Sequence, residues 1–318
     1  MFKKLSYAIA LALCIPAAPA FAQQSTTRII VSFPPGGPVD FVARTIAEQL
    51  GKELGRRVIV ENKAGANGAI GAEAVARSAP DGSTLWLTSV GAAAINPSLY
   101  NKLPYDMKAD FAPISLVVNN VELMVVNPAN PANSAAEFIA AAKTRKAPTP
   151  FASTGIGSIP HFALEQLADT GKAPLLHVPY KGAAPAITDL LGQQVDAFFG
   201  DVPGLISHVR SGRLKAIGIA ADKRHPLLPD VKTLNEQGLP GVDSENWYGL
   251  FAPAKTPPEI ITRLNAAVRK TIATAMVNER LAANGAEPIS STPQELAELL
   301  QRDTDKWAAM IKAKNIKR

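Results

Sequence analysis

The sequence predicts an α/β protein of two lobes that are joined by two crossing segments. Strand-like apolar runs, Gly-rich turns and helix-like runs alternate over residues 28–97, and the same order returns over residues 149–220. Such alternation favours parallel sheets whose turns gather at the carboxyl edge of the strands. A strand-like segment at residues 116–127 and an apolar, strand-like run at residues 247–252 lie where the chain would cross from one sheet to the other and back.

The two crossings divide the chain into lobes. We expect residues 23–125 together with 248–318 to form lobe 1, and residues 126–247 to form lobe 2. The Gly-rich turns of both lobes would then face each other across a cleft. Hinge motion between two such lobes closes a cleft on a ligand.

The first 22 residues have the order of a secretory signal peptide. Lys3 and Lys4 precede an apolar run over residues 5–13, and small residues end the segment at residues 20–22. We expect cleavage after residue 22 and a mature protein in the periplasm. A lipoprotein anchored through Cys14 is the alternative, but a bulky leucine directly precedes this cysteine. Since Cys14 is the only cysteine, the mature chain would have no disulfide and no thiolate metal site.

The composition excludes several classes of protein. Of the 318 residues, 47% are hydrophobic, which is enough for a large core. No run after the signal peptide approaches the roughly 18 apolar residues of a membrane helix. The formal charge of +6 is spread over helix ends and the C-terminal tail without interleaved aromatic residues, which argues against a nucleic-acid partner.

The turn after the first strand contains three prolines and two adjacent glycines. Glycines let a ligand approach main-chain N–H groups, and the start of the following helix favours an anion. We predict that Phe33 forms a wall of the site and that Gly36 and Gly37 donate from the main chain. Asp40 and Arg44 are expected to form a helix cap and an intrahelical ion pair.

The next two strand ends of lobe 1 supply further polar candidates. Asn67 and Gly68 lie in a Gly-rich segment and are predicted to form a second donor loop, although Asn67 equally suits a left-handed turn. Thr88 and Ser89 end the third strand. Their hydroxyls are suited to donate to a carboxylate or to cap a helix.

The second series predicts the strongest anion site. Ser153, Thr154, Gly157 and Ser158 occupy a Gly-rich turn before a helix, where hydroxyls and helix-end N–H groups converge. Ordinary N-capping is the alternative for Ser158. His161 lies one turn into this helix, where a histidine is more often a packing or hydrogen-bonding residue than a base.

Two later strand ends complete the candidate site. Tyr180 and Gly182 follow one strand of lobe 2, and Asp201 follows the next. Asp201 either accepts a hydrogen bond from an amine or amide of the ligand or serves only as a turn residue. The first role would favour an amino acid or an amide-bearing ligand.

Three helix starts carry a Ser or Thr with a glutamate three residues later, which is the pattern of a capping box. They are Ser134, Thr256 and Thr292. The helix after Thr292 carries apolar residues at helical spacing, so we interpret it as a packing element without chemistry.

The motifs follow one another over the whole mature chain. They are residues 33–40 with Arg44, Glu61-Asn62 with 65–71, 80–82, Asn96-Pro97, Tyr105-Asp106 with Asp110-Phe111, 153–158 with His161, 179–182, and Trp247 with Gly249 and Pro253. In this combination the chain resembles the Bug family of extracytoplasmic solute receptors, the binding components associated with tripartite tricarboxylate transporters. Ser83 departs from the family pattern, which usually has an aromatic residue there.

The resemblance implies a two-lobed, type II periplasmic-binding-protein fold of the Venus-flytrap kind. It also implies a small carboxylate ligand, of the dicarboxylate, amino acid or aromatic acid class, held by main-chain N–H groups, hydroxyls and waters between the lobes. The implied partners are the membrane permease subunits of a tripartite transporter or a sensor protein. We expect a monomer with no cofactor, no metal and no catalytic residue.

An exported hydrolase or isomerase that uses the same cleft is the competing hypothesis. The sequence has no Gly-x-Ser-x-Gly elbow and no HExxH motif, and its four histidines are scattered. Ser158 and His161 are the sharpest candidate pair. Residues three apart on one helix rarely aim a nucleophile at its base without a third orienting group.

Overall fold

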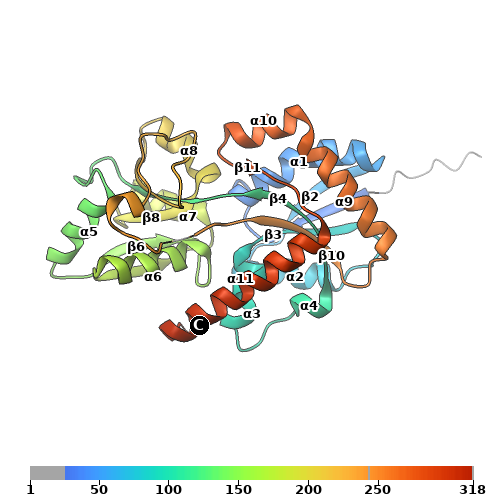
Figure 1. Cartoon of the computed structure of the whole chain (residues 1–318), viewed down its shortest axis with the longest axis horizontal. Helices are drawn as coiled ribbons and strands as arrows, with labels where there is room; N and C mark the ends of the chain where they lie inside the picture. The colour runs from blue at the N-terminus through green and yellow to red at the C-terminus, as the bar shows by residue number, and fades with distance from the viewer. Residues whose placement is uncertain (1–25, 243, 317–318) are drawn as a thin grey trace, which may run out of the picture.

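The computed structural model describes residues 26–242 and 244–316. Two mixed sheets lie side by side, and helices cover both faces of each (Figure 1). The predicted signal peptide, its cleavage site and Cys14 lie outside the described residues. Within the described ranges, no helix is long and apolar enough to cross a membrane.

The first sheet has six strands in the order β11-β4-β10-β3-β1-β2. They are β1 (Thr26–Val31), β2 (Arg57–Asn62), β3 (Thr84–Ser89), β4 (Phe111–Asn119), β10 (Tyr248–Pro253) and β11 (Glu287–Pro288). As the alternation predicts, β1, β2 and β3 run parallel. The sheet is nevertheless mixed, because β10 returns from the other lobe and inserts antiparallel between β3 and β4.

The second sheet has five strands in the order β7-β6-β8-β5-β9. They are β5 (Glu122–Val126), β6 (Thr149–Ser153), β7 (Leu175–Pro179), β8 (Ala197–Asp201) and β9 (Lys215–Ala220). The parallel strands β6, β7 and β8 end together at the edge that faces the first lobe, whereas β5 runs antiparallel to β8 and β9. The Gly-rich turns of both lobes therefore meet between the sheets.

The helices alternate with these strands. The first lobe has α1 (Pro38–Leu54), η1 (Ala66–Gly68), α2 (Ala69–Ala76), η2 (Gly91–Ile95), α3 (Asn96–Leu99), α4 (Met107–Asp110), α9 (Pro258–Ala273), α10 (Ala275–Ala283) and α11 (Pro293–Lys314). The second lobe has α5 (Ala135–Thr144), α6 (Ile159–Gly171), α7 (Ala183–Leu191), α8 (Val202–Arg210) and η3 (Asn235–Gln237).

Two of the three predicted caps are confirmed. Ser134 caps α5 by accepting from the Glu137 N–H, and Thr292 with its glutamate forms a complete capping box on α11. The prediction for Thr256 was wrong, because α9 begins one residue later with Pro257 at the N-cap and no side-chain cap. Two prolines in succession fix the entry of that helix without a hydroxyl.

The two crossings lie side by side and join the sheets. The Asn246 N–H donates to the Asn120 carbonyl at 2.8 Å, the Asn120 amide donates to the Asn246 carbonyl at 3.2 Å, and Val121 pairs with Glu245. We expected lobe 1 to extend to residue 125, but residues 122–126 belong to the second sheet. The chain therefore changes sheets at residues 120–121, where Asn119 and Asn120 interrupt the apolar run.

Apolar clusters cover both faces of each sheet, and one of them continues between the lobes. The Trp307 ring of α11 lies 5.1 Å from the Phe162 ring of α6, and Lys314 at the end of α11 donates to the Glu165 carbonyl at 2.9 Å. Helix α11 thus begins on the first lobe and ends against the second (Figure 1). This confirms its predicted packing role.

Candidate functional site

Two adjoining cavities lie between the lobes. The outer cavity has a volume of about 600 Å³ and the inner one about 50 Å³, and both are lined by residues of both lobes. Nine of the predicted site residues line one or both cavities: Phe33, Gly37, Asn67, Gly68, Ser89, Thr154, Tyr180, Gly182 and Asp201. The six others, Gly36, Thr88, Ser153, Gly157, Ser158 and His161, line neither.

Asp40 fixes the turn that carries Phe33 and the glycines. Its carboxylate accepts from the Gly36 N–H, from Arg44 and from the Asn62 amide, each at 2.9 Å. Burial opposes ionisation, but these hydrogen bonds together hold the pKa of Asp40 below its usual value. The predicted Asp40–Arg44 ion pair is confirmed. The predicted cap was wrong, because Gly37 is the N-cap of α1 and Asp40 accepts from the Gly36 N–H before the helix begins.

Asn67 has the left-handed backbone that its sequence position suggested, and its side chain is engaged by protein groups of both lobes. Its backbone is left-handed, with φ 46° and ψ 44°. Its amide donates to Asn96 at 2.9 Å and, across the cleft, to the Gly157 carbonyl at 3.0 Å. Asn67 is therefore a contact between the lobes, and neighbouring Gly68 packs against Ser32 and Ala92 at a positive φ.

The hydroxyls expected to form the strongest anion site are engaged within the second lobe. Ser153 Oγ lies 2.6 Å from His177 Nε2 and accepts from the Gly155 N–H at 3.1 Å. Ser158 caps α6, as the alternative for it proposed, and its hydroxyl donates to the Gly155 carbonyl at 2.7 Å. The hydroxyls of Ser153 and Ser158 therefore contact groups of their own lobe, which the sequence spacing does not predict. Of the polar residues in this turn that were predicted to bind the anion, only Thr154 lines the cavities.

His161 has a structural environment. Its Nδ1 accepts from the Gly157 N–H at 3.2 Å, and its ring stacks on His177 with 3.9 Å between ring centres. Burial and the neighbouring His161 lower the pKa of His177 to about 4. Thr88 is fully buried in β3, and of the two residues at this strand end only Ser89 lines a cavity.

Three helices begin at the inner cavity. Gly37 is the N-cap of α1, Gly182 the N-cap of α7 and Asp201 the N-cap of α8, and all three line this cavity without capping their helices through a side chain. The starts of helices carry unsatisfied N–H groups and partial positive charge. Convergence of three of them, from both lobes, creates an environment that favours an anion.

Polar side chains from the crossings form the floor of the inner cavity. Asp201 accepts hydrogen bonds from the Tyr248 hydroxyl and, at 2.9 Å, from the Asn246 amide. The same amide donates to Glu122 at 3.3 Å. Sequence reasoning identified Asp201 but missed the other three; the one signal for Glu122 was a lone carboxylate in an apolar strand.

Glycines of the second lobe lie against side chains of the first lobe. A Cβ on Gly157 would overlap Leu99, one on Gly182 would lie 3.3 Å from Pro34, and one on Gly204 would lie 3.5 Å from Pro38. The turns of the two lobes thus touch at three points, which is the geometry of a closed cleft.

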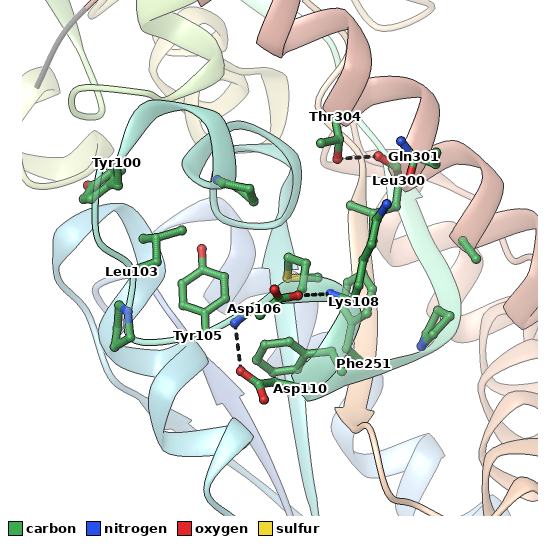
Figure 2. Close-up of a pocket in the computed structure, with 16 residues that line it drawn as sticks. Tyr100, Leu103, Tyr105, Asp106, Lys108, Asp110, Phe251, Leu300, Gln301 and Thr304 are labelled. Atoms are coloured by element: carbon green, nitrogen blue, oxygen red, sulfur yellow. Dashed lines mark hydrogen bonds between the residues drawn. The ribbon is translucent and has the colours of Figure 1, made fainter.

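A larger hollow of about 920 Å³ lies on the first lobe beside α11 and is shown in Figure 2. Its lining comes from one lobe, so closure of the cleft does not cover it. Its acids are engaged locally: Asp106 accepts from the Lys108 N–H, and Asp110 accepts from the Asp106 N–H, both at 2.8 Å. We do not assign the site there. Within the described ranges, no group of three or more His, Cys, Asp or Glu side chains is placed to hold a metal ion.

Comparison with known proteins gives a consistent result. A family model described as "Tripartite tricarboxylate transporter family receptor" matches residues 42–316. Protein BugT of Bordetella pertussis (strain Tohama I) is 37% identical over 300 residues, which cover 93% of this chain and 92% of BugT.

Solved structures of similar proteins share the fold. The structure of the periplasmic binding protein BugD is 34% identical, covers 92% of this chain and 98% of that chain, and superposes with a TM-score of 0.87. MatC from Rhodopseudomonas palustris with bound malate is 34% identical, covers 90% of this chain and 98% of that chain, and has a TM-score of 0.84. The predicted α/β, two-lobed periplasmic-binding-protein fold is confirmed.

Proposed function

The chain belongs to the tripartite tricarboxylate transporter receptor family, also called the Bug family, and on this premise we propose that it is a periplasmic receptor for a small carboxylate-bearing metabolite. The ligand binds in the interlobe cavities, and closure of the lobes retains it. The loaded receptor then delivers its ligand to the permease subunits of a tripartite transporter or to a sensor protein. The chain acts as a binding protein and not as an enzyme.

The convergence of three helix N-termini on the inner cavity carries this proposal. A carboxylate placed there accepts from main-chain N–H groups of both lobes, so it is bound fully only when the cleft is closed. Ser89 and Thr154 add hydroxyls from opposite sides. A related receptor, MatC, holds malate, which is a carboxylate of the size that these cavities admit.

The contacts of the serine and histidine candidates count against the hydrolase alternative. The Ser158 hydroxyl donates to the Gly155 carbonyl, and His161 Nδ1 accepts from a main-chain N–H. A nucleophile needs its proton directed at a free base. Neither side chain lines the cavities, so neither reaches a substrate bound there.

A thermal-shift screen of carboxylates against their neutral amides tests the proposal. A ligand that binds only the native state stabilises it by about 2.7 kcal/mol at a concentration of 100 Kd. We expect at least one carboxylate to raise the melting temperature and its amide to have no effect. NMR of the mixture after prolonged incubation should find the ligand unchanged; turnover, or equal stabilisation by acid and amide, would contradict the receptor function.

A further inference from the structure

Two buried carboxyl groups face each other at the floor of the inner cavity. Glu122 of β5 and Asp201 of β8 are directly paired across the antiparallel strands, and the Asn246 amide donates to both carboxyl groups. Glu122 is fully buried and Asp201 is 9% exposed. Like charges directly opposite on neighbouring strands repel, so one of the two carboxyls holds a proton.

The surroundings decide which member of the pair is charged. Burial and the neighbouring Asp201 raise the pKa of Glu122 well above its usual value. Burial also raises the pKa of Asp201, to about 6, but hydrogen bonds from Tyr248 and Asn246 favour its ionised form. Asp201 is therefore the charged member of the pair, and it is the only one of the two that lines the cavity.

Asp201 has no cationic side chain opposite it. None of the residues that line the inner cavity, all of them described, is Lys, Arg or His. A buried carboxylate without a counter-charge is costly, and the same cost falls on any purely anionic ligand beside it. A ligand that carries its own positive group would lower the free-energy cost of both the buried Asp201 carboxylate and the anionic group of the ligand.

From this geometry we infer that Asp201 is the specificity-determining residue of the cleft and that the ligand is an amino-bearing carboxylate whose ammonium group donates to it. This inference rests on the proposed function and makes the ligand class narrower. The helix N-termini bind the carboxylate, Asp201 binds the ammonium, and Glu122, Asn246 and Tyr248 position Asp201. Glu122 acts as a positioning residue because it does not line the cavity.

Three triads of acids that differ at one substituent test the inference. They are succinate, malate and aspartate; glutarate, 2-hydroxyglutarate and glutamate; and phenylpropionate, phenyllactate and phenylalanine. Isothermal titration of the full mature chain measures each Kd. Within every triad that binds, we expect the amino acid to bind at least tenfold more tightly than the plain acid. A plain or hydroxy acid that binds as tightly as the amino acid would overturn the inference and leave the receptor function standing.

Two substitutions separate recognition from packing. Asp201→Asn keeps the size and an oxygen acceptor for Tyr248 but removes the charge, so we expect the preference for the amino acid to fall to near one. Glu122→Gln, the conservative variant of the positioning residue, keeps a neutral side chain that accepts from Asn246 and should keep the preference. An unchanged preference in Asp201→Asn overturns the inference. If that variant does not fold, the wild-type ratios decide; binding of none of the nine acids would contradict the carboxylate site itself.

Discussion

Substitution of Gly157 by alanine is expected to weaken ligand binding by preventing full closure. Gly157 lies on the second lobe at φ +81°, and a Cβ there would come within 3.0 Å of Leu99 on the first lobe and 3.3 Å from the Asn67 amide. Both neighbours contact Gly157 only when the lobes are together. The added methyl group therefore destabilises the closed form and not the open one.

The magnitude follows from the packing. Overpacking a well-filled contact costs about 1–3 kcal/mol, which raises Kd by about 5- to 150-fold. The left-handed backbone adds about 1 kcal/mol for any residue with a Cβ, but this cost falls on open and closed forms alike and cancels in the affinity. Leu99 is 6% exposed, so its side chain has little room to withdraw.

Gly212→Ala is the matched control. Gly212 also lies in the second lobe at a positive φ, +70°, but its Cβ would meet nothing within 4 Å. We expect both variants to lose similar thermal stability without ligand and only Gly157→Ala to lose affinity in titration calorimetry. Small-angle scattering with ligand should show a larger radius of gyration for Gly157→Ala. Equal affinities in the two variants would refute a lobe contact at Gly157.

Three further predictions concern the turn and the second lobe. Gly37→Val should weaken ligand binding at least tenfold, because its methyl groups would fill the inner cavity. The unfolding free energy should change little, since φ at Gly37 is −81° and a Cβ there meets only the Pro34 carbonyl, at 3.4 Å. Unchanged affinity would show that this turn does not approach the ligand. Asp40→Asn should lower the free energy of unfolding, measured in urea, by about 1–3 kcal/mol, because the buried carboxylate accepts three hydrogen bonds. A smaller decrease would show that these hydrogen bonds are not needed to stabilise the turn. Because the pKa of His177 is lowered in the folded state, protons bind more tightly to the unfolded chain, and the free energy of unfolding should fall as pH drops from 6.5 to about 4. In His177→Gln this loss of unfolding free energy should be smaller by about 1–2 kcal/mol. An equal pH dependence of unfolding in both proteins would contradict this prediction.

Features that depend on neighbouring residues could be predicted from the sequence. The strand, turn and helix order of both lobes and the caps at Ser134 and Thr292 follow from local propensity and short hydrogen bonds. The direction of a hydroxyl within a turn could not be predicted. Ser153 and Ser158 fold back onto Gly155, because the backbone of the turn places its carbonyl and N–H within their reach.

Contacts between segments that are distant in the chain also could not be predicted from the sequence. The pairing of Glu122 with Asp201 depends on strand register, and the contact of Asn67 with Gly157 depends on how the lobes approach. Neither leaves a periodic pattern. Glycines at 157, 182 and 204 could be interpreted only as turn or helix residues, whereas the structure shows that they make room for side chains of the opposite lobe.

The site thus separates affinity from selectivity. The turn at residues 33–38 and the glycines opposite it set how completely the lobes close, and every ligand depends equally on closure. Asp201, which accepts hydrogen bonds from Asn246 and Tyr248, is the residue that we infer to contact the ligand beyond its carboxylate. Substitutions at the turns should therefore multiply the Kd of all ligands by one common factor, whereas a substitution of Asp201 should change the ratios between ligands. A turn variant that changes ligand ratios would show that the turns contribute to selectivity as well as to closure.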